Sequence, residues 1–413
     1  MKPESGRKRN RRLIDRLPDL PQHVWLLLAL QFLMNLSTFT AMPLMAVHMA
    51  DHLRLPAAII GTVFTIHLAL GRAFPVITGP LVDRFGFRNF IVAGLIGRGG
   101  GFLLFSAAAD APTVIGATIL ICLGTAAYES AVYGLFGRQP HHLVTRVFIL
   151  NNFALNLGVV IGPALGSFLT LYDAMLPFRA AALFFLLLGI WSLRFGYLDK
   201  IYAGRSSIAG SWGGVLNDRR FLWFLATTLP WWFLFAQLFV AFPLYATQLA
   251  GNENAASAVF LANGIGGMVF VALSLIAFKW IRPRQMTALC YALLFATYCA
   301  VPAWHSLRWM LLMTFIYTIA ESLILPAIET ITSELAPHDK QATYFGALGL
   351  AWGLGAAMGS YAGSWMVLDV RAPYLIWGLY ASIAALGFLL ALAFRRAEPS
   401  FERAGQPVAS AEQ

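Results

Sequence analysis

The stretch QPHHLVTRVFILNNFALNLGVVIGPALGSFL (residues 139–169) is repeated in outline 197 positions later as APHDKQATYFGALGLAWGLGAAMGSYAGSWM (residues 336–366). Identical residues at this offset include Pro140/Pro337, His141/His338, Phe148/Phe345, Gly158/Gly355, Gly162/Gly359, Gly166/Gly363 and Ser167/Ser364. A second pair, FTAMPLMAVHMAD (39–51) and FVAFPLYATQLAG (239–251), aligns at an offset of 200 and places Pro43 opposite Pro243. Because the two offsets are nearly equal, the chain contains two halves of the same orientation.

Both halves are too apolar for a soluble domain. The 413 residues are 59% hydrophobic and 12% charged, whereas soluble domains carry roughly 25% charged residues. Twelve segments are long enough to cross a hydrocarbon core of about 30 Å. We place them at 22–50, 56–79, 89–109, 112–136, 145–172, 175–197, 220–250, 253–278, 285–303, 307–332, 341–368 and 372–394.

These segments predict an all-α membrane protein with twelve transmembrane helices in two parallel six-helix halves. The predicted divisions are a basic N-terminus at 1–21, a six-helix half at 22–197, a linker at 198–219, a second six-helix half at 220–395 and a tail at 396–413. Parallel halves with a site between them near the midplane are typical of transporters that rock between two states. No segment is typical of a channel selectivity filter.

The net charge of +10 is distributed unevenly across the predicted membrane. If both termini lie on one side, that side carries 23 Lys and Arg outside the spans, and the opposite loops carry 4. This asymmetry predicts that both termini are cytoplasmic. The run RKRNRRLIDR (7–16) is therefore expected to set the topology and to contact anionic membrane lipid, and nucleic-acid binding is disfavoured.

The polar stretch GPLVDRFGFRNF (79–90) separates the second and third predicted spans. Gly79 and Gly86 allow close backbone approach or a positive φ in a short turn. Asp83 precedes the third span, so its carboxylate can accept hydrogen bonds from the free N–H groups of that helix. From the residues alone, the stretch is either a capped turn or a hinge that controls how the spans move.

Residues of this stretch resemble the loop signature of the major facilitator superfamily. The matching positions are Gly79, Leu81, Asp83, Arg84, Gly86 and Arg88, while Phe87 stands where a basic residue is usual. The resemblance extends from about residue 22 to 395 and implies that the loop locks against the other half in one state. The corresponding loop of the second half, FKWIRPRQMT (278–287), keeps the basic residues and lacks the Asp.

A second signature is similar to the twelve-span drug:proton antiporter branch of that family. In GVVIGPALGS (158–167), Gly158, Gly162 and Gly166 form a smooth stripe for close helix contact. Pro163 removes one backbone hydrogen bond and bends the helix. The resemblance implies export in exchange for protons, and the layout of 220–244 is similar to transporters of the multidrug resistance protein H type. However, Leu120 stands where these antiporters usually carry an Arg in the fourth span.

Ionisable side chains inside spans are candidates for function, because each costs about 2.5–3.5 kcal/mol on insertion scales. Arg72, Arg98, Glu129, Glu321 and Glu329 are the main examples. Glu129, then Glu329, Glu321 and Arg98, are candidates for proton coupling, since a carboxyl group in low dielectric is more easily protonated. Arg72 and Arg98 could instead contact an anionic substrate. The alternative is a permanent ion pair of Glu129 with Arg98 or Arg72.

Five further side chains are candidates for the wall of a substrate cavity. Asn152 and Asn156 lie four residues apart on one helix face, and could line a polar cavity or bond neighbouring helices. Trp231, Trp232 and Gln237 combine aromatic rings with one amide. Tryptophan is also common at membrane interfaces, so these rings do not require a cavity.

We expect a secondary active exporter of the cell inner membrane that acts as a monomer, takes a small amphipathic compound as substrate and is driven by protons. An endogenous anionic metabolite such as a siderophore is the alternative substrate, and a non-transporting receptor or scaffold is the alternative class. No phosphate-binding loop, nucleophile and base pair or metal-ligand spacing is present. The sequence therefore predicts no enzyme activity, no cofactor and no metal.

Overall fold

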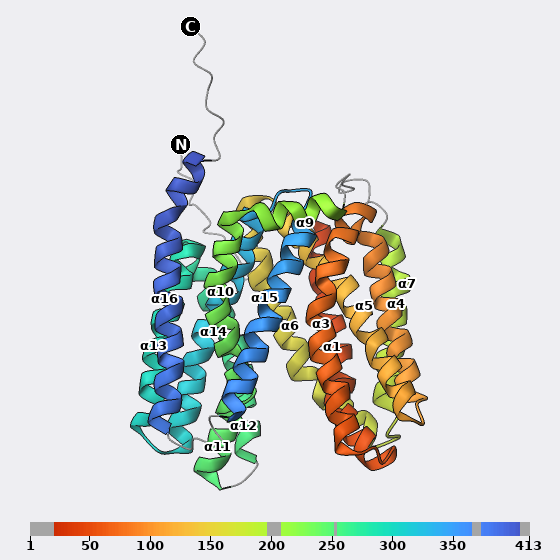
Figure 1. Cartoon of the computed structure of the whole chain (residues 1–413). Helices are drawn as coiled ribbons and strands as arrows, with labels where there is room; N and C mark the ends of the chain where they lie inside the picture. The colour runs from red at the N-terminus through yellow and green to blue at the C-terminus, as the bar shows by residue number, and fades with distance from the viewer. Residues whose placement is uncertain (1–19, 196–207, 252–253, 366–372, 405–413) are drawn as a thin grey trace, which may run out of the picture.

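The computed structural model describes residues 20–195, 208–251, 254–365 and 373–404, and these residues form helices joined by short connections. Two bundles stand side by side (Figure 1). The first contains α1 (Gln22–Ala41), α3 (Ala57–Phe85), α4 (Phe87–Ser106), α5 (Ala111–Gly137), α6 (His141–Thr170) and α7 (Leu176–Ser192). We call this bundle the N-half.

The second bundle, the C-half, repeats this arrangement. It contains α10 (Arg219–Gln237), α11 (Ala241–Ala250), α12 (Asn254–Ala277), α13 (Pro283–Ala300), α14 (Leu307–Leu335), α15 (Gln341–Trp365) and α16 (Pro373–Ala404). A short helix, α9 (Ile208–Asn217), lies across one end of both bundles (Figure 1). The predicted all-α membrane fold in two six-helix halves is confirmed.

Each of the twelve predicted spans corresponds to one helix or to one interrupted helix. Ten of the described helical segments are long and apolar enough to cross a membrane, and α7 is a shorter apolar helix. Two helices run further than expected, since α3 continues to Phe85 instead of ending at residue 79 and α16 continues to Ala404. The segment predicted as linker is helical over Ile208–Asn217, and its first part, 198–207, lies outside the described residues.

The first span of each half is interrupted at the proline that the repeat brings into register. After Ala41 the chain forms the 3₁₀ turn η2 (Met42–Leu44), the short α2 (Met45–Val47) and the π-helical η3 (His48–His52). In the C-half, α10 ends at Gln237 and α11 begins at Ala241, two residues before Pro243. Pro43 and Pro243 lack a backbone N–H, so neither can continue the ladder of the preceding helix.

Glycine stripes hold the fifth span of each half against the first. A Cβ atom on Gly158 or Gly162 would lie 2.7 Å from Leu36 N or Phe39 Cβ of α1, and one on Gly166 would overlap Thr40 O. Gly355, Gly359 and Gly363 of α15 pack in the same way on α10. In hydrocarbon, where no water drives helices together, such close backbone approach supplies the packing energy.

The stripe predicts opposite effects for two glycine substitutions. Gly162→Ala should lower the thermal stability of the purified protein, because overpacking a tight contact costs about 1–3 kcal/mol. Gly116→Ala in α5 is the control, since no atom lies within 4 Å of a Cβ there. It should be neutral or stabilising, because alanine favours a helix by about 0.8–1.0 kcal/mol over glycine. Equal melting temperatures for the two variants would contradict the stripe.

Candidate functional site

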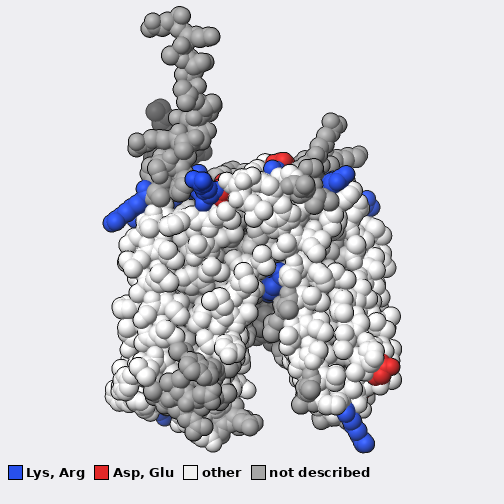
Figure 2. Space-filling model, viewed as in Figure 1, with Lys and Arg blue, Asp and Glu red and all other residues white. Residues whose placement is uncertain are grey.

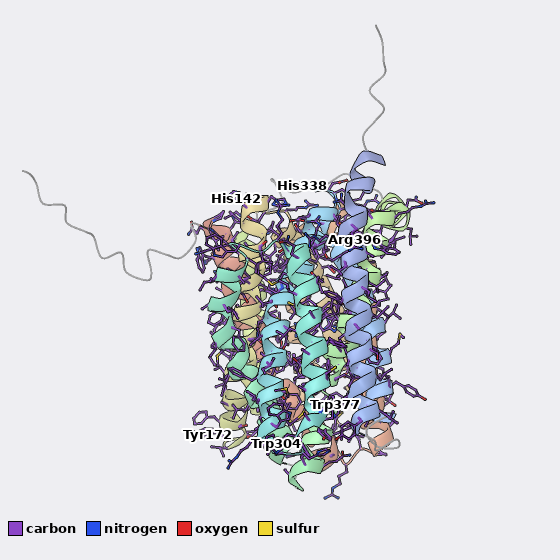
Figure 3. All side chains as sticks on the ribbon, turned by 90° about the vertical axis from the view of Figure 1, so that its left-hand side faces the viewer. His142, Tyr172, Trp304, His338, Trp377 and Arg396 are labelled. Atoms are coloured by element: carbon purple, nitrogen blue, oxygen red, sulfur yellow. The ribbon has the colours of Figure 1, made fainter. Side chains whose placement is uncertain are left out.

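The molecule has one closed end and one open end between its halves. We call the end that carries α9 the linker end; His142, His338 and Arg396 lie there, and Tyr172 and Trp304 lie at the opposite end (Figure 3). The space-filling view shows a hollow between the halves that opens away from the linker end, with basic side-chain atoms inside it (Figure 2). A site that is reached from one side only therefore lies between the halves.

Asp83 joins the two halves at the linker end. Its carboxylate, fully buried in the last turn of α3, accepts hydrogen bonds from the backbone N–H of Ala342 (3.2 Å), the N–H of Thr343 (2.8 Å) and the Thr343 hydroxyl (2.7 Å). Arg138, at the end of α5, donates from 3.1 Å. The carboxylate thus sits at the positive N-terminal end of α15. Asp83 therefore does not form the local alternative, a cap on the next helix of its own half; its partners in α15 belong to the other half.

The other residues of the loop signature have separate roles. Gly86 has a φ of 94°, which permits the turn from α3 to α4. Gly79 is not in the turn; it lies within α3, where an added Cβ would be 2.6 Å from Ala342 O. Arg84 is exposed, and Arg88 donates to the carbonyl of Leu193 (2.7 Å) in its own half. Of this signature, Gly79 and Asp83 contact α15 directly.

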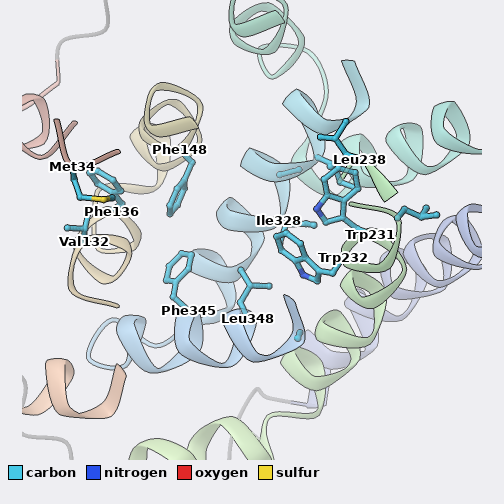
Figure 4. Close-up of a cluster of buried hydrophobic side chains, with 14 of the residues drawn as sticks. Met34, Val132, Phe136, Phe148, Trp231, Trp232, Leu238, Ile328, Phe345 and Leu348 are labelled. Atoms are coloured by element: carbon cyan, nitrogen blue, oxygen red, sulfur yellow. The ribbon is translucent and has the colours of Figure 1, made fainter. Parts of the chain in front are cut away.

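Further contacts across the interface seal the linker end. They are Ser333 Oγ to Gly137 O (2.6 Å), Thr330 Oγ1 to Thr145 Oγ1 (3.2 Å), His141 Nε2 to Glu334 Oε1 (3.2 Å) and the facing rings of Phe148 and Phe345 (5.5 Å; Figure 4). Each pairs an N-half residue with a C-half residue. These bonds must break before the hollow could open toward the linker end.

Arg72 lies where the two halves meet, further from the linker end than Asp83 on the same helix. Its Nη1 atom is 3.8 Å from Glu129 Oε2, and the two side chains are 29% and 28% exposed. The guanidinium also lies over the ring of Trp352 in α15. Trp352 stacks on Trp232 with centroids 5.2 Å apart and an interplanar angle of 26°. A cation, a carboxylate and two stacked rings therefore occur together between α3, α5, α10 and α15; all are partly exposed except Trp232, which is buried.

Arg98 does not share this position. It is 3% exposed and donates to Met34 Sδ (3.0 Å) and Thr38 Oγ1 (2.7 Å), both on α1. The neighbouring glycines leave no space around it, because Gly99 packs on Leu186 of α7 and Gly101 packs on α5. Glu129, which from the sequence could pair with either Arg98 or Arg72, thus lies beside Arg72.

The two acidic residues of α14 have different neighbours. Glu329, 6% exposed, accepts a hydrogen bond from Asn152 Nδ2 (3.0 Å) and another from the Tyr133 hydroxyl, both in the N-half. Glu321 accepts from Asn263 Nδ2 (2.5 Å) on α12, within the C-half. Only the bonds of Glu329 cross the interface.

The remaining predicted cavity residues divide between the interface and the helix packing. Asn156 lies against Gly267 of the C-half. Trp231 is fully buried and stacks on Tyr317 at 6.1 Å, so it belongs to the core of the C-half. Gln237, also fully buried, donates to the carbonyl of Gly359 (2.9 Å) and holds α10 against α15. Of the three residues predicted in α10, Trp232 is the one beside Trp352.

Sequence reasoning missed Trp352 and Tyr133. Trp352 is one of 12 tryptophans, and tryptophans in membrane proteins gather at interfaces, which concealed it. Its signal is its place in the middle of α15, three residues before Gly355 of the stripe. Tyr133 lies four residues after Glu129, and therefore on the same face of α5.

Comparison with known proteins agrees with this architecture. The chain matches the Major Facilitator Superfamily over residues 27–303 and 280–411. It is 25% identical over 374 residues to the multidrug resistance protein MdtH of Klebsiella pneumoniae (strain 342), which covers 88% of this chain and 92% of that protein. It is also 25% identical over 385 residues to the uncharacterized MFS-type transporter YdeE of Escherichia coli (strain K12), with coverages of 90% and 95%.

Solved structures share the fold at low sequence identity. The human organic anion transporter MFSD10 superposes with a TM-score of 0.68 at 16% identity, covering 90% of this chain and all of that one. The proton:xylose symporter XylE gives 0.66 at 14% identity, covering 90% and 94%. The fold and the family match define a multi-pass membrane transporter and not an enzyme. The chain belongs to the Major Facilitator Superfamily.

The contacts of Asp83 predict that Asp83→Asn opens the linker end. Hydrogen bonds to a charged group are worth about 1.5–3 kcal/mol, and the amide loses both the charge and one acceptor atom. Spin labels on His142 and His338, which lie at this end in different halves, should report longer distances in Asp83→Asn. Arg84→Gln is the matched control, because it removes a charge from an exposed residue of the same turn. Identical distance distributions in Asp83→Asn and the unsubstituted protein would show that the loop is only a turn.

Proposed function

We propose that this transporter exports a small amphipathic compound across the cell inner membrane in exchange for protons, by alternating access. The similarity to multidrug resistance proteins supports export of drug-like compounds. The uneven distribution of Lys and Arg supports a cytoplasmic linker end. The hollow would then open away from the cytoplasm, which is the state in which an exporter releases its substrate (Figure 2).

The single observation that carries the proposal is the one-sided seal. Asp83, Ser333 and Thr330 make hydrogen bonds between the halves at the linker end, while the opposite end is open (Figure 2). A path closed on one side and open on the other is what alternating access requires, and the parallel halves can exchange the two arrangements by rocking. The Gly158–Gly166 stripe and Pro163 lie in α6, and the stripe packs on α1 of the same half, so they would move as part of one half.

Among the acidic candidates, Glu329 has the contacts best suited to couple protons to rocking. As a carboxylate it is a strong acceptor for Asn152 and Tyr133. Protonation removes the charge and weakens both bonds, so the seal loosens and the proton can leave toward the cytoplasm. Glu129 is also a candidate, but its pairing with Arg72 opposes protonation, because a neutral Glu129 would leave Arg72 without its counter-ion.

Proton-driven export is tested in inside-out membrane vesicles with an acidic interior. Compounds to which expression confers growth tolerance should accumulate in these vesicles, and an uncoupler should abolish the accumulation. A sodium gradient of the same size, without a pH difference, serves as the control for a different driving ion. Accumulation that persists with the uncoupler would exclude proton antiport, and absence of any uptake would favour a receptor or scaffold.

The role of Glu329 predicts a separation of exchange from uphill transport. Glu329→Gln should still exchange labelled for unlabelled substrate but should lose most proton-driven accumulation, since the amide imitates a carboxyl that cannot release its proton. Glu321→Gln is the matched control on the same helix, because its bond to Asn263 stays within one half. Glu129→Gln tests the other candidate in the same assay. Full accumulation by Glu329→Gln, with loss in Glu129→Gln, would assign the proton to Glu129.

A further inference from the structure

The two halves carry opposite charges in the middle of the membrane. Among the described residues, the N-half holds two cations and one carboxylate away from the span ends, namely Arg72, Arg98 and Glu129. The C-half holds the acids Glu321 and Glu329 there, each bonded to neutral donors. Asp83 is left out of this comparison, because it lies at the linker end, where its carboxylate is paired with Arg138 and hydrogen-bonded to the N-terminus of α15. The N-half therefore has one positive charge in excess near the hollow.

Glu129 cannot neutralise both arginines. It is close enough to act electrostatically on each of them, yet its contact with Arg72 is long for an ion pair, at 3.8 Å, compared with about 2.7–2.9 Å for a charge-assisted hydrogen bond. Arg98 is enclosed within its own half, bonded to the neutral groups Met34 and Thr38. Arg72 is the partly exposed cation of the two, so it is the one that a molecule in the hollow can reach.

The aromatic side chains around Arg72 favour a ligand that has a planar apolar group next to its charged group. Trp352 lies under the guanidinium and stacks on Trp232, and Phe235 meets Trp352 edge-on with centroids 6.1 Å apart. Aromatic rings bind one another best in offset or edge-on arrangements. Trp232 is only 5% exposed, so a planar ring in the hollow would meet the partly exposed Trp352 and not Trp232.

We propose that Arg72 and Trp352, with the buried Trp232 supporting Trp352 from within the C-half, form the binding site for an aromatic carboxylate. The ligand carboxylate binds the Arg72 guanidinium through both of its oxygens, since a guanidinium matches a carboxylate in a bidentate pair. Glu129, at 3.8 Å, does not make this bidentate contact. The aromatic part of the ligand packs on Trp352. This inference rests on the proposed export function and narrows its substrate to amphipathic anions or zwitterions that carry a planar ring.

An aromatic cation fits the same place less well. Glu129 would have to leave Arg72 to receive it, and the displaced Arg72, together with Arg98, would repel it. The two ligand classes therefore respond in opposite directions to loss of the Glu129 charge. Removing that charge frees Arg72 for a carboxylate and removes the counter-ion that a cation would find beside Arg72.

Binding to the purified protein tests the ligand class without requiring transport. Three probes of one shape are compared by isothermal calorimetry and tryptophan fluorescence: 9-anthracenecarboxylate, its neutral carboxamide and 9-anthracenylmethylammonium. The carboxylate should bind about tenfold more tightly than the carboxamide, which corresponds to about 1.4 kcal/mol, and the ammonium should bind most weakly. Tightest binding by the ammonium would overturn the proposal.

Two substitutions make the test specific to the site. Arg72→Gln should abolish the preference for the carboxylate over the carboxamide, and Glu129→Gln should increase the affinity for the carboxylate several-fold. Arg179→Gln is the matched control, because Arg179 is exposed and pairs with Asp173 away from these residues. Weaker carboxylate binding in Glu129→Gln, or an unchanged preference in Arg72→Gln, would contradict the assignment.

The binding and transport results separate the two proposals. Carboxylate binding at Arg72 without proton-driven accumulation in vesicles would refute antiport and leave the ligand class standing. Proton-driven export by a protein that shows no preference for the carboxylate would refute the ligand class and leave export standing.

Discussion

The buried carboxylate of Asp83 is the contact on which the closed arrangement of this transporter depends. Three donors from the first turn of α15 and one guanidinium surround it, and it has no exposure to water. A charge in such a place is tolerated only when its acceptor positions are filled. Because two of the partners belong to the other half, separating the halves exposes the carboxylate and leaves the N-terminus of α15 uncapped. Opening therefore exposes a buried charge at this residue, in addition to breaking the other contacts of the seal.

Prolines inside the spans create a second set of constraints. Each proline leaves the carbonyl four residues earlier without its helical donor, and hydrocarbon offers no water to replace it. The carbonyl of Val76, freed by Pro80, accepts from the Trp212 indole of α9 at 3.1 Å. The carbonyl of Ser322, freed by Pro326, accepts from the Ser274 hydroxyl at 3.0 Å. The carbonyls that these prolines free thus accept hydrogen bonds from neighbouring helices. The bond from Trp212 also holds α9 against α3.

The sequence predicts the fold far better than the site, for physical reasons. Span length, apolarity and the repeat each depend on many residues, so the two-half helical fold follows from pattern alone. The glycine stripe was also readable, because spacing by four fixes one helix face. In contrast, the partner of Asp83 is 259 residues away in the chain, and only the packing of α3 on α15 brings them together. From the residues alone, a cap on the next helix and a hinge stayed open, and only the family resemblance implied a contact with the other half.

Charged residues inside spans were recognisable as candidates, but their partners were not. Glu129 lies within reach of two arginines, and rotation of a helix by one residue would change which of them it meets; the structure selects Arg72. Trp352 escaped notice because its importance comes from Arg72 and Trp232, which lie on α3 and α10. Side-chain neighbours of this kind are set by helix rotation and tilt, which the apolar pattern of a membrane span specifies only weakly.

The duplicated scaffold explains how the two halves can take different tasks. The backbone features that the repeat preserves, such as Pro43 with Pro243 and the paired glycine stripes, maintain the same helix packing in both halves. The arginines of α3 and α4 have no counterpart in the middle of α12 and α13, whereas the acids Glu129 of α5 and Glu329 of α14 lie in corresponding spans. Since packing is fixed by the small residues, polar side chains at the interface were free to diverge. An anion-attracting N-half facing an acid-bearing C-half is the consequence, and it separates the group that would hold a substrate from the group that would carry a proton.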